Sequence, residues 1–467
     1  MTVAQEMVES LPRAPALAAP PRPARPLSTW QLLRVGLSNT LAACDEELFD
    51  ELFVERRFFW GRLFVVNDPD GIKRVLQDNV DNYPRINAIR RVFEFGSGTG
   101  MLCAEGEIWR RHRRALNPTL DHRAIVAETP MLIELAQQLA GHLERLPAGQ
   151  EINVGEVFTH LLTRSTGQVF AGDDREIDEM VQHMGHFPGK YGFVDFMPLP
   201  RWLHFVDRFR KSRGAARHLH PLLERLIGER RRDDYAGGRD LLWRIAHARD
   251  RQSGERLTVP ELEDEALTLG STSVTALQVY SWLWYLLAAH PWAEARLHAE
   301  LAEVLGGRVP SAADLPRLTY LRKLVDEAMR LYPPLPVMLR RAVTDDVVCG
   351  RRIPRKSVVA VMPWVVHRHR KLWADPDRFD PERFAPDQVA ARSRYAYLPF
   401  SVGPHICIGA ALSLAEITAT VAVLAQRFRF RLAPGATVQP IAWTSLRPGS
   451  GLMMTVEPRG SGRHGGG

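Results

Sequence analysis

The most constraining feature of this chain is a short glycine-containing segment, Phe400 to Gly409, that surrounds a single cysteine, Cys407. The residues that follow it, from Ala410 onward, are strong helix formers. Gly403 and Gly409 permit backbone conformations and close approaches that a Cβ would hinder. We therefore predict a tight loop that places the Cys407 sulfur just before a helix N-terminus, where amide N–H groups favour a thiolate. The alternative is an inert buried cysteine in a turn.

Composition places the chain among large globular proteins. Its 467 residues are 45% hydrophobic and 25% charged, enough for a core that can enclose a cofactor. The cysteines are far apart, which argues against a zinc cluster or a disulfide framework; they are Cys44, Cys103, Cys349 and Cys407. The net charge of +7 is modest, and no basic run is interleaved with aromatic residues, so a nucleic-acid partner is not expected.

The patterning favours one domain that is mainly α with small β-sheets. Periodicity predicts helices over 261–290 and 318–331, a strand over 62–66 and a hairpin over 347–361. We expect residues 1–29 to be a disordered proline-rich lead-in, 30–458 to form the domain, and 459–467 to be a disordered glycine-rich tail. The most apolar stretch is too short to cross a bilayer, so we expect no membrane span. The cysteine spacing suits a reducing compartment, and we expect a cytoplasmic monomer.

Two helical pairs carry further information. Trp109 and Arg113 stand four apart and share one helix face, although an amphipathic basic helix would look the same. Glu327 and Arg330 stand three apart and can also meet. An exposed pair of this kind contributes little, so the spacing alone is weak evidence; a Pro-Glu-Arg-Phe segment that contains Arg383 stands downstream.

The spacing Phe-x-x-Gly-x-x-x-Cys-x-Gly, together with these motifs in order from residue 109 to 409, resembles the cytochrome P450 superfamily of the soluble bacterial kind. The resemblance implies haem b (iron protoporphyrin IX) held between the central long helix and the helix after Cys407, with Cys407 as the iron ligand. It also implies a cofactor-binding set: Trp109, Arg113, Arg340, Phe400, Gly403, His405, Cys407 and Gly409. Arg341 competes with Arg340 for the propionate role. Glu327, Arg330 and Arg383 would form a buried structural triad behind the haem.

The central helix departs from the family pattern. Thr275 falls on the position that assists oxygen activation, so Thr275 and Cys407 are the expected catalytic residues. Val274 stands where the family usually has an acid, and Thr272 where it usually has a glycine. A hydroxyl can donate and accept hydrogen bonds, whereas valine cannot relay a proton. Either Thr275 with a water or a substrate hydroxyl replaces the acid, or the acid is dispensable here.

The implied reaction is insertion of one oxygen atom of O2 into an apolar substrate of terpenoid, fatty-acyl, steroid-like or polyketide type, by hydroxylation or epoxidation. Electrons would come from an external ferredoxin or flavodoxin-type donor with its reductase, attracted by Arg110, Arg111 and Arg114. Arg85, Arg90 and Arg91 are expected to face solvent, and the alternative is that they pair with a carboxylate. The expected pocket residues are Ser271, Val274, Val337, Met338, Phe193 and Phe196. A peroxide-using enzyme and a haem protein without turnover remain as alternatives.

Overall fold

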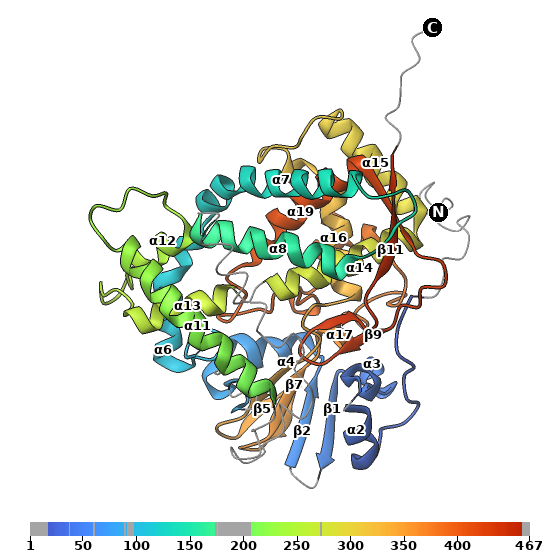
Figure 1. Cartoon of the computed structure of the whole chain (residues 1–467). Coiled ribbons are helices and arrows are strands. Elements are labelled where there is room, and N and C mark those ends of the chain that lie inside the picture. Colours follow the sequence, from blue (N-terminus) through green and yellow to red (C-terminus); the bar gives the residue numbers. More distant parts are fainter. Residues whose placement is uncertain are drawn as a thin grey trace.

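The computed structural model describes residues 17–36, 38–58, 61–87, 90, 98–172, 175, 207–270 and 273–459. Helices fill one side of the molecule and the largest sheet lies on the other (Figure 1). The helices are α2 (Thr29–Gly36), α3 (Glu47–Asp50), α4 (Pro69–Lys73), α6 (Gly106–Leu116), α7 (His122–Glu144), α8 (Val154–Ala171), α11 (Asp207–Arg230), α12 (Leu241–His247), α13 (Val259–Gly270), α14 (Ser273–Ala289), α15 (Pro291–Leu305), α16 (Thr319–Leu331), α17 (Pro363–Val366), α18 (Pro386–Ala391) and α19 (Ala410–Arg427).

The strands form small sheets from segments far apart in the sequence. They are β1 (Phe53–Phe58), β2 (Gly61–Val66), β3 (Glu151–Asn153), β4 (Met338–Arg341), β5 (Asp346–Val348), β6 (Arg351–Ile353), β7 (Val358–Val361), β8 (Phe428–Leu432), β9 (Pro440–Ala442), β10 (Leu446–Pro448) and β11 (Met453–Pro458). Strands order as β1-β2-β7-β4 in the four-stranded sheet and as β3-β11-β8 in the three-stranded sheet, while β9 pairs with β10 and β5 with β6.

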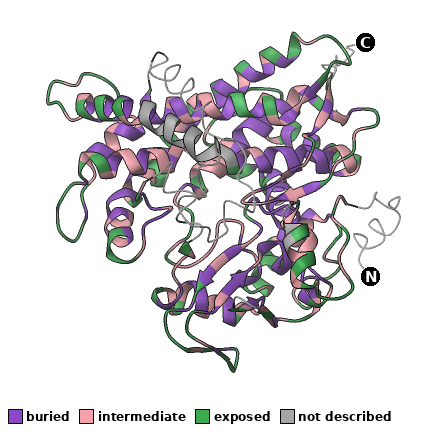
Figure 2. Cartoon of the chain, turned by 60° about the horizontal axis from the view of Figure 1, so that its bottom comes forward, coloured by how far each residue is buried: buried purple, intermediate pink, exposed green. Residues whose placement is uncertain are grey.

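The principal core lies between the long helices. Helix α19 packs against α7, and α14 packs against both α8 and α16. Aromatic side chains fill this layer: Trp282 of α14 stacks on Tyr332 with ring centroids 4.0 Å apart, and Phe158 of α8 stacks on Tyr280 at 4.6 Å. Figure 2 shows buried residues concentrated on the inner sides of these helices. Such close packing gives the site a rigid frame.

Most predicted elements are present with shifted ends. The strand over 62–66 is β2 and the helix over 318–331 is α16. The expected helix over 261–290 corresponds to α13 and α14, and residues 271 and 272 between them lie outside the described ranges. The expected hairpin over 347–361 is only partly correct: β5 and β6 pair through Cys349 and Gly350, both at positive φ, whereas β7 joins the larger sheet.

The expectation of a disordered lead-in is wrong from residue 17 onward. The Ala18 amide donates to the Tyr285 hydroxyl at 3.1 Å, and the Tyr332 hydroxyl donates to the Ala18 carbonyl at 2.9 Å. Arg22 lies over the Phe49 ring at 4.0 Å and bonds Asp377. Prolines suit an extended strap that satisfies its polar groups through tertiary contacts. Residues 1–16 and 460–467 lie outside the described ranges.

Candidate active site

The cysteine loop has the geometry that its sequence predicts. The Cys407 amide donates to the Phe400 carbonyl at 2.9 Å, which closes the loop, and α19 begins at Ala410 with Gly409 as its N-cap. Gly403 has φ +71°, and a Cβ there would lie 2.3 Å from the Leu76 carbonyl oxygen. Because a side chain would meet backbone at that point, this position requires glycine.

Opposing effects act on the Cys407 thiol. Its side chain is accessible, yet the surrounding protein desolvates it and raises its pKa. The backbone N–H groups of Gly409 and Ala410 and the charge of Arg113 favour the thiolate and oppose that rise. A cation held at the sulfur would complete this stabilisation, because a coordinated thiol is deprotonated outright.

Arginine side chains converge on His405, two residues before Cys407. The ring of His405 lies 4.0 Å from the ring of Trp109, and Arg85 Nη2 lies 2.9 Å from its Nδ1. Burial, followed by the charges of Arg85, Arg340 and Arg113, lowers the pKa of His405 to about 2. His405 is therefore neutral at physiological pH. The predicted propionate residues Trp109, Arg113, Arg340 and His405 are thus brought together.

Arg340 is the most deeply buried cation of this cluster. It is 6% exposed, and burial together with the Arg85 charge lowers its pKa to about 10. Arg341, its competitor for the role, is exposed. Arg85, which the sequence placed in solvent, has a side chain only 15% exposed and pairs with Glu105 Oε1 at 3.0 Å. That expectation was wrong because an isolated bridge between residues 85 and 340 turns the chain inward.

The helix that carries Trp109 and Arg113 is fixed from behind by a buried histidine–carboxylate pair. His112 Nδ1 lies 2.6 Å from Glu265 Oε1 of α13, and neither side chain is exposed. The same oxygen accepts from the Met101 amide at 2.8 Å, while Arg111 pairs with Glu261 on the same helix. These contacts orient α6 so that the face bearing Trp109 meets the cysteine loop. Sequence spacing gave no signal of this pairing.

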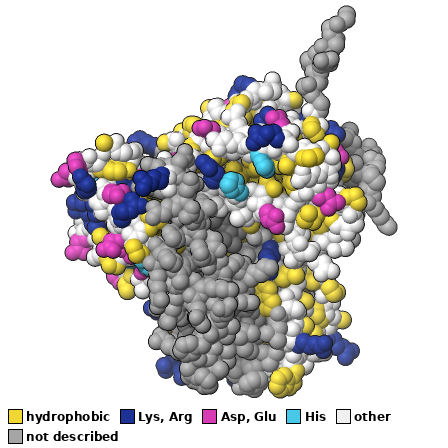
Figure 3. Space-filling view, in the orientation of Figure 1, with side chains coloured by type: hydrophobic (Ala, Val, Ile, Leu, Met, Phe, Trp, Pro, Cys, Tyr) yellow, Lys and Arg dark blue, Asp and Glu magenta, His cyan; other side chains and the backbone are white. Residues whose placement is uncertain are grey.

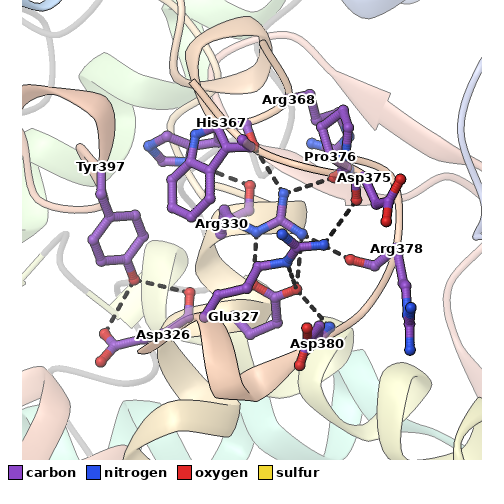
Figure 4. Close-up of polar contacts among 12 residues, drawn as sticks. Asp326, Glu327, Arg330, His367, Arg368, Asp375, Pro376, Arg378, Asp380 and Tyr397 are labelled. Carbon is purple, nitrogen blue, oxygen red and sulfur yellow. Dashed lines mark hydrogen bonds and ion pairs between the residues drawn. The ribbon is translucent and has the colours of Figure 1, made fainter. Parts of the chain in front are cut away.

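Glu327 and Arg330 assemble into a buried group of polar contacts between α16 and the segment that follows α17 (Figure 4), and Arg383 lies close to them. Arg330 donates to both Glu327 oxygens, at 2.6 and 2.7 Å, and both side chains are fully buried. Arg330 also bonds the carbonyls of His367, Pro376 and Arg378. Backbone acceptors thus satisfy the remaining donors, which a buried charge requires.

Arg383 joins this set more loosely than expected. Its Nε lies 3.8 Å from Glu327 Oε1, and its Nη atoms donate instead to the carbonyls of Ala374 and Asp375. Only the Arg330–Glu327 contact has two direct bonds. The group therefore anchors the chain between α16 and η7 (Pro381–Phe384) through backbone carbonyls as much as through charge pairing.

The structure describes only some of the remaining predicted site residues. Thr275 is exposed in the first turn of α14. Met338 is buried and Val337 half-buried at the start of β4. The side chain of Val274, and the residues Ser271, Phe193 and Phe196, lie outside the described ranges.

The arginines expected to attract an electron donor are already paired with acids of this chain. Arg110 bonds Asp81 at 2.6 Å, Arg111 pairs with Glu261, and Arg114 bonds Asp250 at 2.7 Å. In the view of Figure 3, basic and acidic side chains are interspersed around α6 and α12. These ion pairs reduce the net positive field that the sequence suggested.

The fold and the site define a mainly helical protein with a cysteine loop beside a cluster of arginines. The chain belongs to the cytochrome P450 family, whose sequence model matches residues 20–458. It resembles cyclooctat-9-en-7-ol 5-monooxygenase of Streptomyces melanosporofaciens, with 32% identity over 87% of this chain and 88% of that protein. Cyclooctatin synthase of the same organism is 32% identical over 78% and 79%.

The solved structures agree on the fold. The haem domain of cytochrome P450DA superposes with a TM-score of 0.77 at 23% identity, over 87% of this chain and 90% of that one. Family membership makes this chain an oxidoreductase of the monooxygenase class, dependent on haem and on an external electron source. Among the described helices, none is both long and apolar enough to cross a membrane.

The residues present fit a haem. The cluster contains three arginines, Arg85, Arg113 and Arg340, and one neighbouring carboxylate, Glu105. Its excess of positive charge suits the two propionates of a haem. Cys407 supplies one sulfur donor with amide support. A neutral His405 adds a ring nitrogen beside the same cations.

Proposed function

We propose that this protein is a haem-thiolate monooxygenase that inserts one oxygen atom of O2 into a terpenoid. The observation that carries the proposal is the Cys407 loop, closed at 2.9 Å onto Phe400 and set beside the His405 arginine cluster. Cys407 would be the iron ligand, and Arg85, Arg113 and Arg340 would hold the propionates. When bound, a haem with thiolate ligation supplies activation of O2 by favouring O–O cleavage.

The haem is proposed to be type b. Covalent attachment of a c-type haem needs a Cys-x-x-Cys-His segment, and the cysteines at 44, 103, 349 and 407 provide none. Retention must therefore come from Cys407, the arginine cluster and burial. The roles of Trp109, Phe400, Gly403 and Gly409 in this proposal are to shape the loop and its contact with α6.

Thr275 is proposed to hold and orient water and oxygen at the first turn of α14. Its hydroxyl both donates and accepts hydrogen bonds, and the neighbouring Val274 offers no proton. Water bound near Thr275 would then deliver protons in place of the usual carboxylate. The substrate class rests on the names of the relatives, one of which acts on the cyclic alkenol cyclooctat-9-en-7-ol. The electron donor is proposed to be a ferredoxin or flavodoxin-type protein.

The carbon-monoxide difference spectrum of the reduced protein tests the proposal. We expect a strongly red-shifted Soret band in the wild type and in Cys349→Ser, an exposed-cysteine control, and its loss in Cys407→Ser. A band typical of histidine ligation, or an unchanged band in Cys407→Ser, would contradict the thiolate assignment. Product formation from cyclic terpenoids with a ferredoxin system then tests turnover, and efficient turnover with peroxide alone would favour the peroxygenase alternative.

A further inference from the structure

A partly buried carboxylate, Glu416, has no role in the site described so far. Glu416 lies on α19, nine residues after Cys407, and faces α8 and α14. Its Oε1 atom is buried and has no hydrogen-bond partner among the described residues. In the described part of the chain no lysine, arginine or histidine forms an ion pair with it. An unpaired buried carboxylate is costly and needs a functional or structural explanation.

Glu416 lines a cavity that reaches the predicted haem site from two sides. Gly409, which donates toward Cys407, and Ala276, which follows Thr275, are both part of its wall. Ser165 and Ser413 are polar members of the same wall. The cavity therefore extends from Glu416 to Gly409 at the end of the cysteine loop and to Ala276 of α14, the neighbour of Thr275.

The groups that face Glu416 allow it to titrate near neutral pH. Burial raises its pKa to about 7, and a hydrogen bond from Ser165 of α8 opposes that rise. Tyr280 of α14 stays protonated, because burial, and then the charge of Glu416, raise its pKa well above the usual value. From α7 the cavity is lined by Leu132, which carries no charge. Glu416 is thus the titrating group of this cavity.

We propose that Glu416 takes up a proton when the bound haem is reduced. One electron passes from the donor to the iron, one proton passes from solvent to a carboxylate oxygen of Glu416, and no protein bond is broken. The added negative charge raises the proton affinity of a carboxylate nearby in a low-dielectric interior, so the two events are coupled. This inference rests on the haem-thiolate function proposed above.

The test is the midpoint potential of the haem measured against pH, from about pH 5 to about pH 9, where an acid of raised pKa titrates. The wild-type potential should fall with rising pH, by up to about 59 mV per pH unit for a one-electron couple. Glu416→Gln should lose that part of the slope. Ser165→Ala removes the bond that lowers the Glu416 pKa, so it should move the sloping region to higher pH.

The matched control is Glu144→Gln, which changes an exposed carboxylate paired with Arg427 at the end of α19. Its slope should equal that of the wild type. Infrared spectra of reduced minus oxidised protein should show the carbonyl band of a protonated acid in the wild type and not in Glu416→Gln. Equal slopes in the wild type and Glu416→Gln would overturn the inference.

The carbon-monoxide spectrum keeps the two proposals separate. If the wild type lacks the red-shifted band, the haem-thiolate function fails. If every variant shows that band and the slopes are equal, only the role of Glu416 fails. If Glu416→Gln does not bind haem, Ser165→Ala decides the question. A pH range of falling potential that is the same in Ser165→Ala and in the wild type would contradict the coupling.

Discussion

The Arg85 guanidinium lies 2.9 Å from Nδ1 of His405, although the residues are 320 positions apart in the sequence. Because a guanidinium can only donate, His405 accepts at Nδ1 and carries its proton at Nε2. Arg340 and Arg113 also act on this ring, which keeps it neutral. The arrangement directs positive charge to the edge of the cysteine loop, and one of its consequences can be measured directly.

Replacing Arg85 should weaken haem retention. We expect Arg85→Ala to release haem about 10- to 150-fold faster, since loss of a charge-assisted hydrogen bond costs about 1.5–3 kcal/mol. Transfer of haem to an excess of apomyoglobin measures the rate. Arg57→Ala is the control, because that side chain is 72% exposed. Equal haem release rates in Arg85→Ala and Arg57→Ala would show that Arg85 does not help to hold the haem.

Replacing Glu327 should destabilise the whole domain. In Glu327→Gln the buried Arg330 keeps its charge and loses its carboxylate partner. Breaking a buried pair from one side costs about 3–5 kcal/mol, and we expect a loss of stability of that order in chemical denaturation. Glu382→Gln changes a half-exposed side chain and should lower the free energy of unfolding far less. Similar losses in both variants would show that the pair is not an anchor.

Supplying an acid beside Thr275 should change how electrons are used. We expect Val274→Glu to raise the ratio of product formed to reductant consumed by about twofold, a small part of the ~10²–10⁴ that a positioned acid can contribute. Thr275→Ala should lower the same ratio, because the hydroxyl is lost. Unchanged coupling and an unchanged pH profile in Val274→Glu would show that an acid is dispensable here.

The Glu416 carboxyl should make stability depend on pH. Its pKa in the folded protein, about 7, lies above the ordinary value of 4.5, so the folded state binds the proton more tightly. The associated stability is fully present below the ordinary pKa and is lost as pH rises toward 7 and beyond. Glu416→Gln should therefore be more stable than the wild type at alkaline pH, by about 1–3 kcal/mol.

Urea unfolding of both proteins at acidic and alkaline pH measures this difference. The extra stability of Glu416→Gln should vanish at acidic pH, where the wild-type carboxyl is protonated and resembles the glutamine side chain. A gain of equal size at both pH values would indicate a packing effect unrelated to titration.

Local sequence predicted those features that depend on short-range geometry. The cysteine loop and the start of α19 follow from glycine placement and helix propensity, and the Glu327–Arg330 contact follows from their spacing on one helix. Family membership and the α-rich fold were also predicted, because these short motifs occur in the family's order along the chain. The backbone carbonyls that accept from Arg383, those of Ala374 and Asp375, were not predicted. Residue spacing does not reveal which backbone groups of another segment a side chain meets.

The sequence by itself determined the cysteine loop, the helical pairs and hence the family, because each depends on residues within a few positions of one another. Only the tertiary structure decided that Arg85 lies beside His405 in the arginine cluster, that Arg111 is neutralised by Glu261, and that no cation pairs with Glu416 among the residues the structure describes. The reason is physical: charge pairing and desolvation depend on which distant segments meet when the core packs, and no local pattern encodes that distance.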